Sequence, residues 1–219
     1  KSVRRMVKSL DHRQLIIGVD RLDYSKGLHQ RFLSYERLLE KYPNTQNNVT
    51  LMQIAPPTRV GVRAYDEIRS ELEQASGRIN GRFASSDWVP IRYLNKGIGR
   101  KPLMGFFRNA DVGLVTPVRD GMTLVAKEYV VAQDPDDPGM LVLSSLAGAA
   151  CELTDAVIVN PYDRDSVADG IATAITMSLE ERRERHAAMM KVLKKNDITA
   201  WRTRFVDALL QRYREATST

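Results

Sequence analysis

The chain has 219 residues, of which 43% are hydrophobic and 27% charged, the balance of a globular protein with a full core. This composition excludes a disordered tail, a collagen-like repeat and a small disulfide-stapled scaffold. No apolar run reaches the roughly 20 residues that span a membrane, and the single cysteine, Cys151, cannot form a disulfide within the chain. We therefore expect a cytoplasmic location and interpret Cys151 as a small buried apolar residue.

The net charge is +6, from 33 basic and 27 acidic side chains. Such an excess would suit nucleic acid, a membrane surface or a phosphorylated small molecule. The basic residues are scattered, however, and mostly have acidic neighbours, as in the run 180–185. No basic cluster is interleaved with aromatic residues, as a nucleic-acid surface requires. We therefore expect solvated helix surfaces, no nucleic-acid or membrane partner, and only a few functional cations.

Short apolar runs alternate with longer amphipathic segments along the chain. The β-branched run at 15–19 is typical of a strand buried on both faces, and apolar residues at three- and four-residue spacing predict a helix over 28–42. Gly77 or Gly81 is expected to close a long helix that begins at 60. In chain order, the same criteria predict further strands at 49–55, 89–94, 112–115, 141–144 and 156–159, and helices at 60–79, 101–109, 122–133, 147–153, 166–177, 179–194 and 200–215.

Strands that alternate with helices require right-handed crossovers and form a parallel sheet covered on both faces. The predicted fold class is therefore α/β, a Rossmann-like doubly wound parallel sheet. Because the sequence contains no repeat, low-complexity segment or linker, we predict a single domain over 1–219. Ligands of such folds bind beyond the carboxyl ends of the strands.

Several familiar ligand signals are absent from the sequence. It contains no GxxxxGK[ST] loop and no GxGxxG after the first predicted strand, which argues against P-loop nucleotides and NAD. The three histidines lie far apart, and the acidic residues at 134, 136 and 137 are expected to form a solvated loop rather than a metal site. We expect no metal and no cofactor.

Charged residues follow the first predicted strand, in the stretch 20–27. Arg21 offers a forked donor and Lys26 a compact charge, just before a helix N-terminus that favours anions. The two cations would suit a diphosphate. Alternatively, Arg21 pairs with Asp20 or Asp23, and Lys26 simply faces water. Spacing alone favours neither interpretation.

A second stretch, 116–128, follows the fourth predicted strand. Gly121 permits a tight turn and a close approach of the backbone to a ligand. The amides of 122–125 are then first-turn donors without an intrahelical partner. Asp120 could accept from a sugar hydroxyl, and Glu128, on the helix that follows, from a ribose diol. Taken alone, however, Asp120 as a helix N-cap and Glu128 as an ordinary surface carboxylate are the simpler interpretation.

Together, the two stretches resemble a known family. Asp120 and Glu128, with seven residues between them, fit the acidic-x7-acidic element of retaining GT-B glycosyltransferases. The chain is similar to the trehalose-6-phosphate synthase family over essentially its whole length, in six motifs in the same order: 21–27, 53–56, 77–81, 111–117, 124–129 and 160–163. The resemblance implies the C-terminal, nucleotide-sugar-binding domain of a two-domain GT-B enzyme. The N-terminal acceptor domain is then absent from this chain, which would account for its start at Lys1.

The resemblance implies roles for residues in both stretches. Arg21 and Lys26 match the cations that bind the donor diphosphate in place of a metal, and Asp120 matches the acid that holds the donor glucose; these three form the catalytic set. Glu128 matches the residue on the ribose hydroxyls. Besides Arg21 and Lys26, the donor-binding set comprises Ile98, Asp120, Gly121, Met122, Thr123, Leu124, Val125, Ala126, Lys127 and Glu128.

Three further positions matter for what the resemblance implies. Ile98 falls where the family binds the uracil ring through its main chain and commonly has phenylalanine. Arg59 matches an arginine that reaches the acceptor phosphate. Thr123 replaces the usual asparagine, so donor preference would change if a side-chain contact to the sugar were lost.

The implied activity is transfer of glucose from UDP-glucose to glucose-6-phosphate, which gives trehalose-6-phosphate and UDP. Retention without a carboxylate nucleophile implies a front-face route, in which the leaving phosphate helps to deprotonate the attacking hydroxyl. The isolated chain, without a facing acceptor domain, is expected to be inactive. A related transferase with another nucleotide sugar or pseudo-sugar donor and a non-catalytic homologue are the alternatives, and a homo-oligomer stays open.

Overall fold

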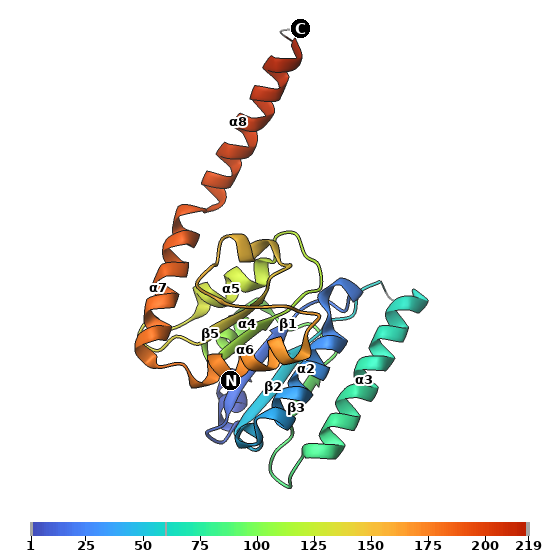
Figure 1. Ribbon diagram of the computed structural model, residues 1–219. Coiled ribbons are helices and arrows are strands. Elements are labelled where there is room, and N and C mark those ends of the chain that lie inside the picture. Colours follow the sequence, from blue (N-terminus) through green and yellow to red (C-terminus); the bar gives the residue numbers. More distant parts are fainter. Residues whose placement is uncertain (1, 60, 218–219) are drawn as a thin grey trace.

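The computed structural model describes residues 2–59 and 61–217, and its centre is a six-stranded sheet (Figure 1). Its strands are β1 (Gln14–Val19), β2 (Val49–Ile54), β3 (Ile91–Leu94), β4 (Val112–Val115), β5 (Met140–Ser144) and β6 (Val157–Val159). All neighbouring strands are parallel, in the order β3-β2-β1-β4-β5-β6. The predicted Rossmann-like doubly wound sheet is confirmed.

Helices cover both faces of the sheet, because right-handed crossovers on the two sides of the β1–β4 pair lead to opposite faces. On one face of the sheet, α2 packs against α3 and α6. On the other face, α4 packs against α1 and α5. Figure 1 shows α2 and α6 side by side. The helices are α1 (Ser2–Lys8), α2 (Leu28–Lys41), α3 (Arg63–Phe83), α4 (Arg100–Arg108), α5 (Leu124–Ala132), α6 (Arg164–Thr176), α7 (Leu179–Lys195) and α8 (Ile198–Thr217), with 3-10 turns η1 (Tyr24–Lys26), η2 (Pro43–Thr45) and η3 (Gly148–Cys151).

The apolar patterns that predicted the first strand and helix form the core. In β1, Leu15, Ile16 and Ile17 are almost completely buried. In α2, all five apolar positions of the predicted stripe are buried: Leu28, Phe32, Tyr35, Leu38 and Leu39. Strand and helix thus pack through the faces that their sequence periods predict.

Helix α3 differs from its prediction at both ends. It begins at Arg63, and residue 60, where the sequence placed its start, lies outside the described residues. Neither Gly77 nor Gly81 ends it, because the helix continues to Phe83. The last turns are held by tertiary contacts, since the Asn80 side chain bonds both the amide and the carbonyl of Ile91 at 2.9 Å. These contacts outweigh the low helix propensity of glycine.

Two further expectations from the sequence are wrong, and one helix was not predicted. Helix α1 occupies Ser2–Lys8 and buries Met6. The segment expected as a helix at 147–153 contains only the 3-10 turn η3. Cys151 ends that turn and is exposed rather than buried, whereas Ala149 occupies the buried position of the same turn.

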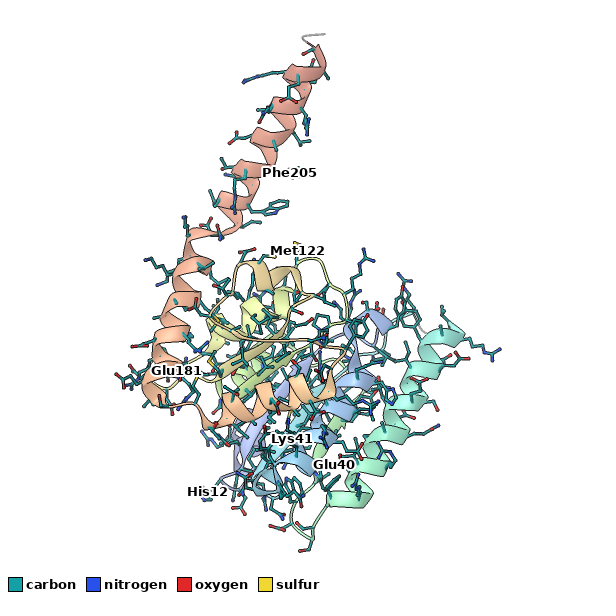
Figure 2. The ribbon with its side chains drawn as sticks, viewed as in Figure 1. His12, Glu40, Lys41, Met122, Glu181 and Phe205 are labelled. Atoms are coloured by element: carbon teal, nitrogen blue, oxygen red, sulfur yellow. The ribbon has the colours of Figure 1, made fainter. Side chains whose placement is uncertain are left out.

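Helix α8 extends away from the body of the molecule (Figures 1 and 2), and none of its described residues is buried. Its apolar side chains are nevertheless large, and Trp201 and Phe205 stack with ring centroids 5.2 Å apart. Among the described residues, no helix is both long and apolar enough to cross a membrane. The helix therefore presents an apolar face that nothing in the described chain covers.

Replacing Gly77 by alanine is expected to stabilise the protein. A Cβ at this exposed position of α3 would meet no atom within 4 Å, and alanine loses less backbone entropy on folding, which favours the helix by about 0.5–1 kcal/mol. Urea denaturation measures the gain. Gly170→Ala, in α6, is the matched control and should lose stability, because its Cβ would lie 2.4 Å from Val159 Cγ1. A loss of stability for Gly77→Ala would contradict the continuous helix.

Candidate functional site

The two charged stretches meet where the strand order of the sheet reverses. β1 and β4 are neighbours, but the chain leaves β1 towards β2 and leaves β4 towards β5. Open α/β sheets bind ligands in the crevice at this point. The two loops touch through their backbones, because the carbonyl of Ser25 accepts from the amides of Val118 and Arg119 at 3.0 and 3.3 Å. Gly27 has φ +62°, and a Cβ there would lie 3.1 Å from the Thr116 carbonyl.

The cation of one stretch pairs with the carboxylate of the other. Lys26 Nζ lies 2.9 Å from Asp120 Oδ2, and both side chains are largely buried. Arg21 is exposed and has no ion pair within 4 Å among the described residues. Asp20 is occupied by Arg31, at 2.6 Å. Within the described residues Arg21 forms an ion pair with neither Asp20 nor Asp23, and Lys26 pairs with Asp120, so the alternative in which Arg21 pairs with Asp20 or Asp23 and Lys26 faces water is wrong.

Asp23 shapes the first loop. Its Oδ1 accepts hydrogen bonds of 2.9 Å from both the amide and the hydroxyl of Ser25, which makes Asp23 the N-cap of η1. Partial burial raises the pKa of Asp23, but the bonds from Ser25 and the charges of Arg21 and Lys26 lower it more, so the pKa lies below its ordinary value. Asp23 thus stays a carboxylate that fixes the turn carrying Lys26.

Helix α5 begins with backbone donors that have no acceptor. Its N-cap is Thr123, not Asp120 as the simpler interpretation held, and Asp120 Oδ1 instead accepts from the Gly121 amide at 3.1 Å. Thr123 is buried at 4% exposure, has φ +54°, and its hydroxyl lacks a hydrogen-bond partner among the described residues. A β-branched residue rarely adopts this conformation. The amides of 122–125 likewise have no acceptor in the described chain, and such donors at a helix N-terminus are suited to an anion.

The turn at Asp120 is braced by the loop after β5. The Asp120 amide donates to the Leu146 carbonyl at 3.4 Å, and the Gly148 amide donates to the Asp120 carbonyl at 3.0 Å. A Cβ on Gly148 would lie only 1.5 Å from the Gly121 carbonyl oxygen. Only glycine therefore fits beside this turn.

The candidate residues of α5 differ in what their side chains contact. Glu128 is exposed and has no ion pair or hydrogen bond within the described chain. Lys127 pairs with Glu152 at 2.9 Å, and Ala126 is buried, its amide donating to the Thr123 carbonyl at 3.0 Å. Met122, Leu124 and Glu128 face outwards (Met122 is labelled in Figure 2), whereas Ala126 and the Lys127 ammonium are engaged by the protein.

Arg59 and Ile98 lie in other loops. Arg59, with φ +47°, places its guanidinium 5.6 Å from the ring centroid of Tyr65. Tyr65 in turn makes an edge contact with Tyr24, at 6.3 Å between centroids, so Arg59 is linked to the loop after β1. Ile98, between β3 and α4, packs against the core and lines a groove of about 420 Å³ together with Leu94 and other residues.

Three residues that build this site were missed by sequence reasoning. Arg31 and Gln53 are buried beneath the loops and bond each other at 2.9 Å. Arg31 continues the apolar stripe of α2 at helical spacing, and Gln53 interrupts an otherwise apolar buried strand, so each was detectable as a polar residue in a core pattern. Gly148 gave no such signal, because its closeness to Gly121 arises from tertiary packing.

The fold and this edge define an α/β domain with a lysine, a carboxylate and unpartnered helix amides at the switch point, where such folds bind ligands. The sequence profile of glycosyltransferase family 20 matches residues 1–211. The chain therefore belongs to glycosyltransferase family 20.

The relatives are consistent with this assignment. The chain is 60% identical over 194 residues to a trehalose-6-phosphate synthase of Klebsiella pneumoniae, covering 89% of this chain and 41% of the relative. A UDP-forming alpha,alpha-trehalose-phosphate synthase of Burkholderia xenovorans, in complex with glucose-6-phosphate, has a TM-score of 0.94 and 55% identity over 96% of this chain and 46% of its own. An Escherichia coli structure, bound with UDP-2-fluoro glucose, has a TM-score of 0.92 and 56% identity over 95% and 46%. The chain thus spans less than half the length of these relatives.

Thr123→Asn is expected to stabilise the protein, because asparagine tolerates the left-handed conformation that strains a β-branched residue. The relieved strain is about 1 kcal/mol, measured by urea denaturation. Thr50→Asn serves as the control: Thr50 is also buried, lies in the extended strand β2, and its hydroxyl accepts from Trp88 Nε1 at 3.1 Å, so this change should destabilise. Equal losses at both positions would show that Thr123 is not strained.

Proposed function

We propose that the chain is the C-terminal, donor-binding domain of a trehalose-6-phosphate synthase. The full enzyme would transfer glucose from UDP-glucose to glucose-6-phosphate. The observation that carries the proposal is the convergence of Lys26, Asp120 and the free amides of 122–125 at the switch point of the sheet. The ligands of the related structures, glucose-6-phosphate and UDP-2-fluoro glucose, support the same substrates here.

Each candidate residue receives a role that its surroundings allow. Lys26 has three N–H donors, so it can hold Asp120 with one and phosphate oxygens with the others. Arg21, exposed and without an ion pair within 4 Å in the described chain, would add a forked contact to the diphosphate. Asp120 would accept from a glucose hydroxyl, and Glu128 from the ribose diol. These contacts supply the charge that a metal supplies elsewhere, so we propose metal-independent binding.

Two loops would complete the substrates' surroundings. The main chain at Ile98 would contact the uracil ring. Arg59, oriented by Tyr65, would reach the acceptor phosphate. The backbone amides of the α5 N-terminus do not depend on the side chain of Thr123, so its replacement of asparagine leaves the phosphate contacts in place.

The chemistry we propose is a front-face transfer with retention. The leaving diphosphate would accept the proton of the attacking hydroxyl, while Arg21 and Lys26 stabilise the charge that develops on it and Asp120 orients the sugar. The contribution of the protein is then positioning and electrostatic stabilisation rather than covalent catalysis.

A facing acceptor domain is part of the proposal. The chain spans less than half of its relatives, and the large apolar side chains of α8 are uncovered in the described residues. We propose that the remainder of the enzyme, a cytoplasmic protein, covers this helix and supplies most of the acceptor site. The isolated chain would accordingly bind donor but make no product.

The chain is expected to bind UDP, and to bind it equally well in EDTA. Arg21→Ala and Lys26→Ala should each remove charge-assisted contacts of about 1.5–3 kcal/mol, which is about 10- to 100-fold in Kd. Arg183→Ala is the matched control, since this arginine lies on α7 and bonds the Asp136 carbonyl. Calorimetry measures all four proteins. Loss of UDP binding in EDTA would contradict metal independence. If Arg21→Ala, Lys26→Ala and Arg183→Ala weaken UDP binding equally, diffuse positive charge rather than a defined site binds the ligand.

Glu128→Gln tests the placement of the ribose. The change keeps the shape of the side chain but removes its charge and half its acceptor capacity, so UDP affinity should fall about tenfold. Affinity for inorganic pyrophosphate, which has no ribose, should not change. Glu180→Gln, an exposed carboxylate of α7, should affect neither ligand. Equal losses for UDP and pyrophosphate would place Glu128 on the phosphates instead.

A further inference from the structure

A buried arginine connects the ends of three strands beneath the candidate site. Arg31, in α2, is 1% exposed. Its Nη1 donates to Asp20 Oδ2 at 2.6 Å and to Gln53 Oε1 at 2.9 Å, and its Nε donates to Thr116 Oγ1 at 3.0 Å. Its Nη2 lies 3.5 Å from the Lys26 carbonyl. One planar group thus reaches the carboxyl ends of β1, β2 and β4 and the loop that carries Lys26.

Stability alone does not explain this arrangement. Burying an ion pair costs several kcal/mol of desolvation per ion, and apolar residues of similar volume often replace such pairs without loss. The backbone hydrogen bonds of the parallel sheet already hold β2, β1 and β4 together. What the guanidinium adds is direction, because its donors point in fixed directions within one plane.

The sequence also makes room for this group at a neighbouring position. A Cβ on Gly18 would lie 2.3 Å from Gln53 Oε1 and 2.8 Å from Arg31 Nη1. Glycine weakens the interior of a strand, so its presence in β1 is explained by the close approach of the polar network.

Two partners of Arg31 belong to the two loops that meet in the site. Thr116 begins the loop that leads to Asp120, and the Lys26 carbonyl lies in the loop after β1. The ammonium of Lys26 and the carboxylate of Asp120, which belong to the same two loops, are 2.9 Å apart. Arg31 therefore contacts both loops, in addition to the backbone hydrogen bonds from Val118 and Arg119 to Ser25.

We propose that Arg31 is a positioning residue of the donor site. It acts through Thr116 and Lys26, sets the separation of the Lys26 ammonium and the Asp120 carboxylate, and does not itself touch the ligand. That the Lys26–Asp120 separation matters for donor binding rests on the proposed function. That Arg31 sets this separation does not.

The experiment compares Thr116→Val, which removes the hydroxyl that accepts from Arg31, with Thr116→Ser, which restores it. Thr50→Val is the control, because it removes a buried strand hydroxyl that accepts from Trp88 Nε1, away from the site. Arg31→Lys keeps the charge but loses the fork. Crystal structures of the ligand-free variants give the Lys26–Asp120 separation, calorimetry gives the Kd for UDP, and urea denaturation gives the stability.

In Thr116→Val and Arg31→Lys we expect the Lys26–Asp120 ion pair to be broken and the Kd for UDP to rise at least about fivefold, the equivalent of one hydrogen bond. Thr116→Ser should keep both the ion pair and the affinity. Thr50→Val should lose stability only. If Thr116→Val keeps the ion pair and loses only stability, Arg31 is merely structural and the proposal is overturned. If the ion pair breaks as expected but no form of the chain binds UDP, the positioning role stands and the proposed function fails.

Discussion

The candidate site depends on a charge buried directly beneath it. The guanidinium of Arg31 is withdrawn from water, and its hydration is replaced by Asp20, Gln53 and Thr116. Burial raises the pKa of Asp20, and the charge of Arg31 acts against that rise. Each ion is thus tolerated because the other is present. The sheet's own hydrogen bonds join β2, β1 and β4, and Arg31 adds a contact from α2 to the carboxyl end of each of these strands.

The edge of the sheet that carries the candidate site differs from the opposite edge in how its polar groups are satisfied. At the opposite edge, Asp111 Oδ2 accepts from the Leu15 amide at 2.7 Å, which closes the start of β1. At the carboxyl edge, the amides of 122–125, the Thr123 hydroxyl and the Glu128 carboxylate have no partner within the described chain. Of these side chains, Thr123 is buried, and buried polar groups in folded proteins are normally paired. The unpartnered groups gather around the start of α5, where the proposed donor would contact them.

The sequence predicted the fold well, because the relevant signals are local. Apolar runs and helical spacing fixed β1 and α2, and the alternation of elements implied the parallel sheet. The same reasoning placed Arg21, Lys26 and Asp120 in two loops, and Glu128 on the helix after the second, without saying that Lys26 and Asp120 would pair. It missed the polar network of Arg31 and Gln53 and the brace at Gly148, since both arise from contacts between distant segments. It also predicted that α3 ends at one of its glycines, whereas tertiary contacts extend the helix to Phe83. It predicted that Cys151 is buried, whereas this residue lies at the surface.

We propose that a nucleoside diphosphate binds at the N-terminus of α5. Amide chemical shifts of the nitrogen-15-labelled chain, recorded during a UDP titration in EDTA, test this most directly. We expect the largest shifts at 121–125 and at Lys26. His12, which lies on the opposite side of the body of the molecule from Met122 (Figure 2), should be unaffected. Largest shifts around His12, or saturable binding with no change at 121–125, would contradict it.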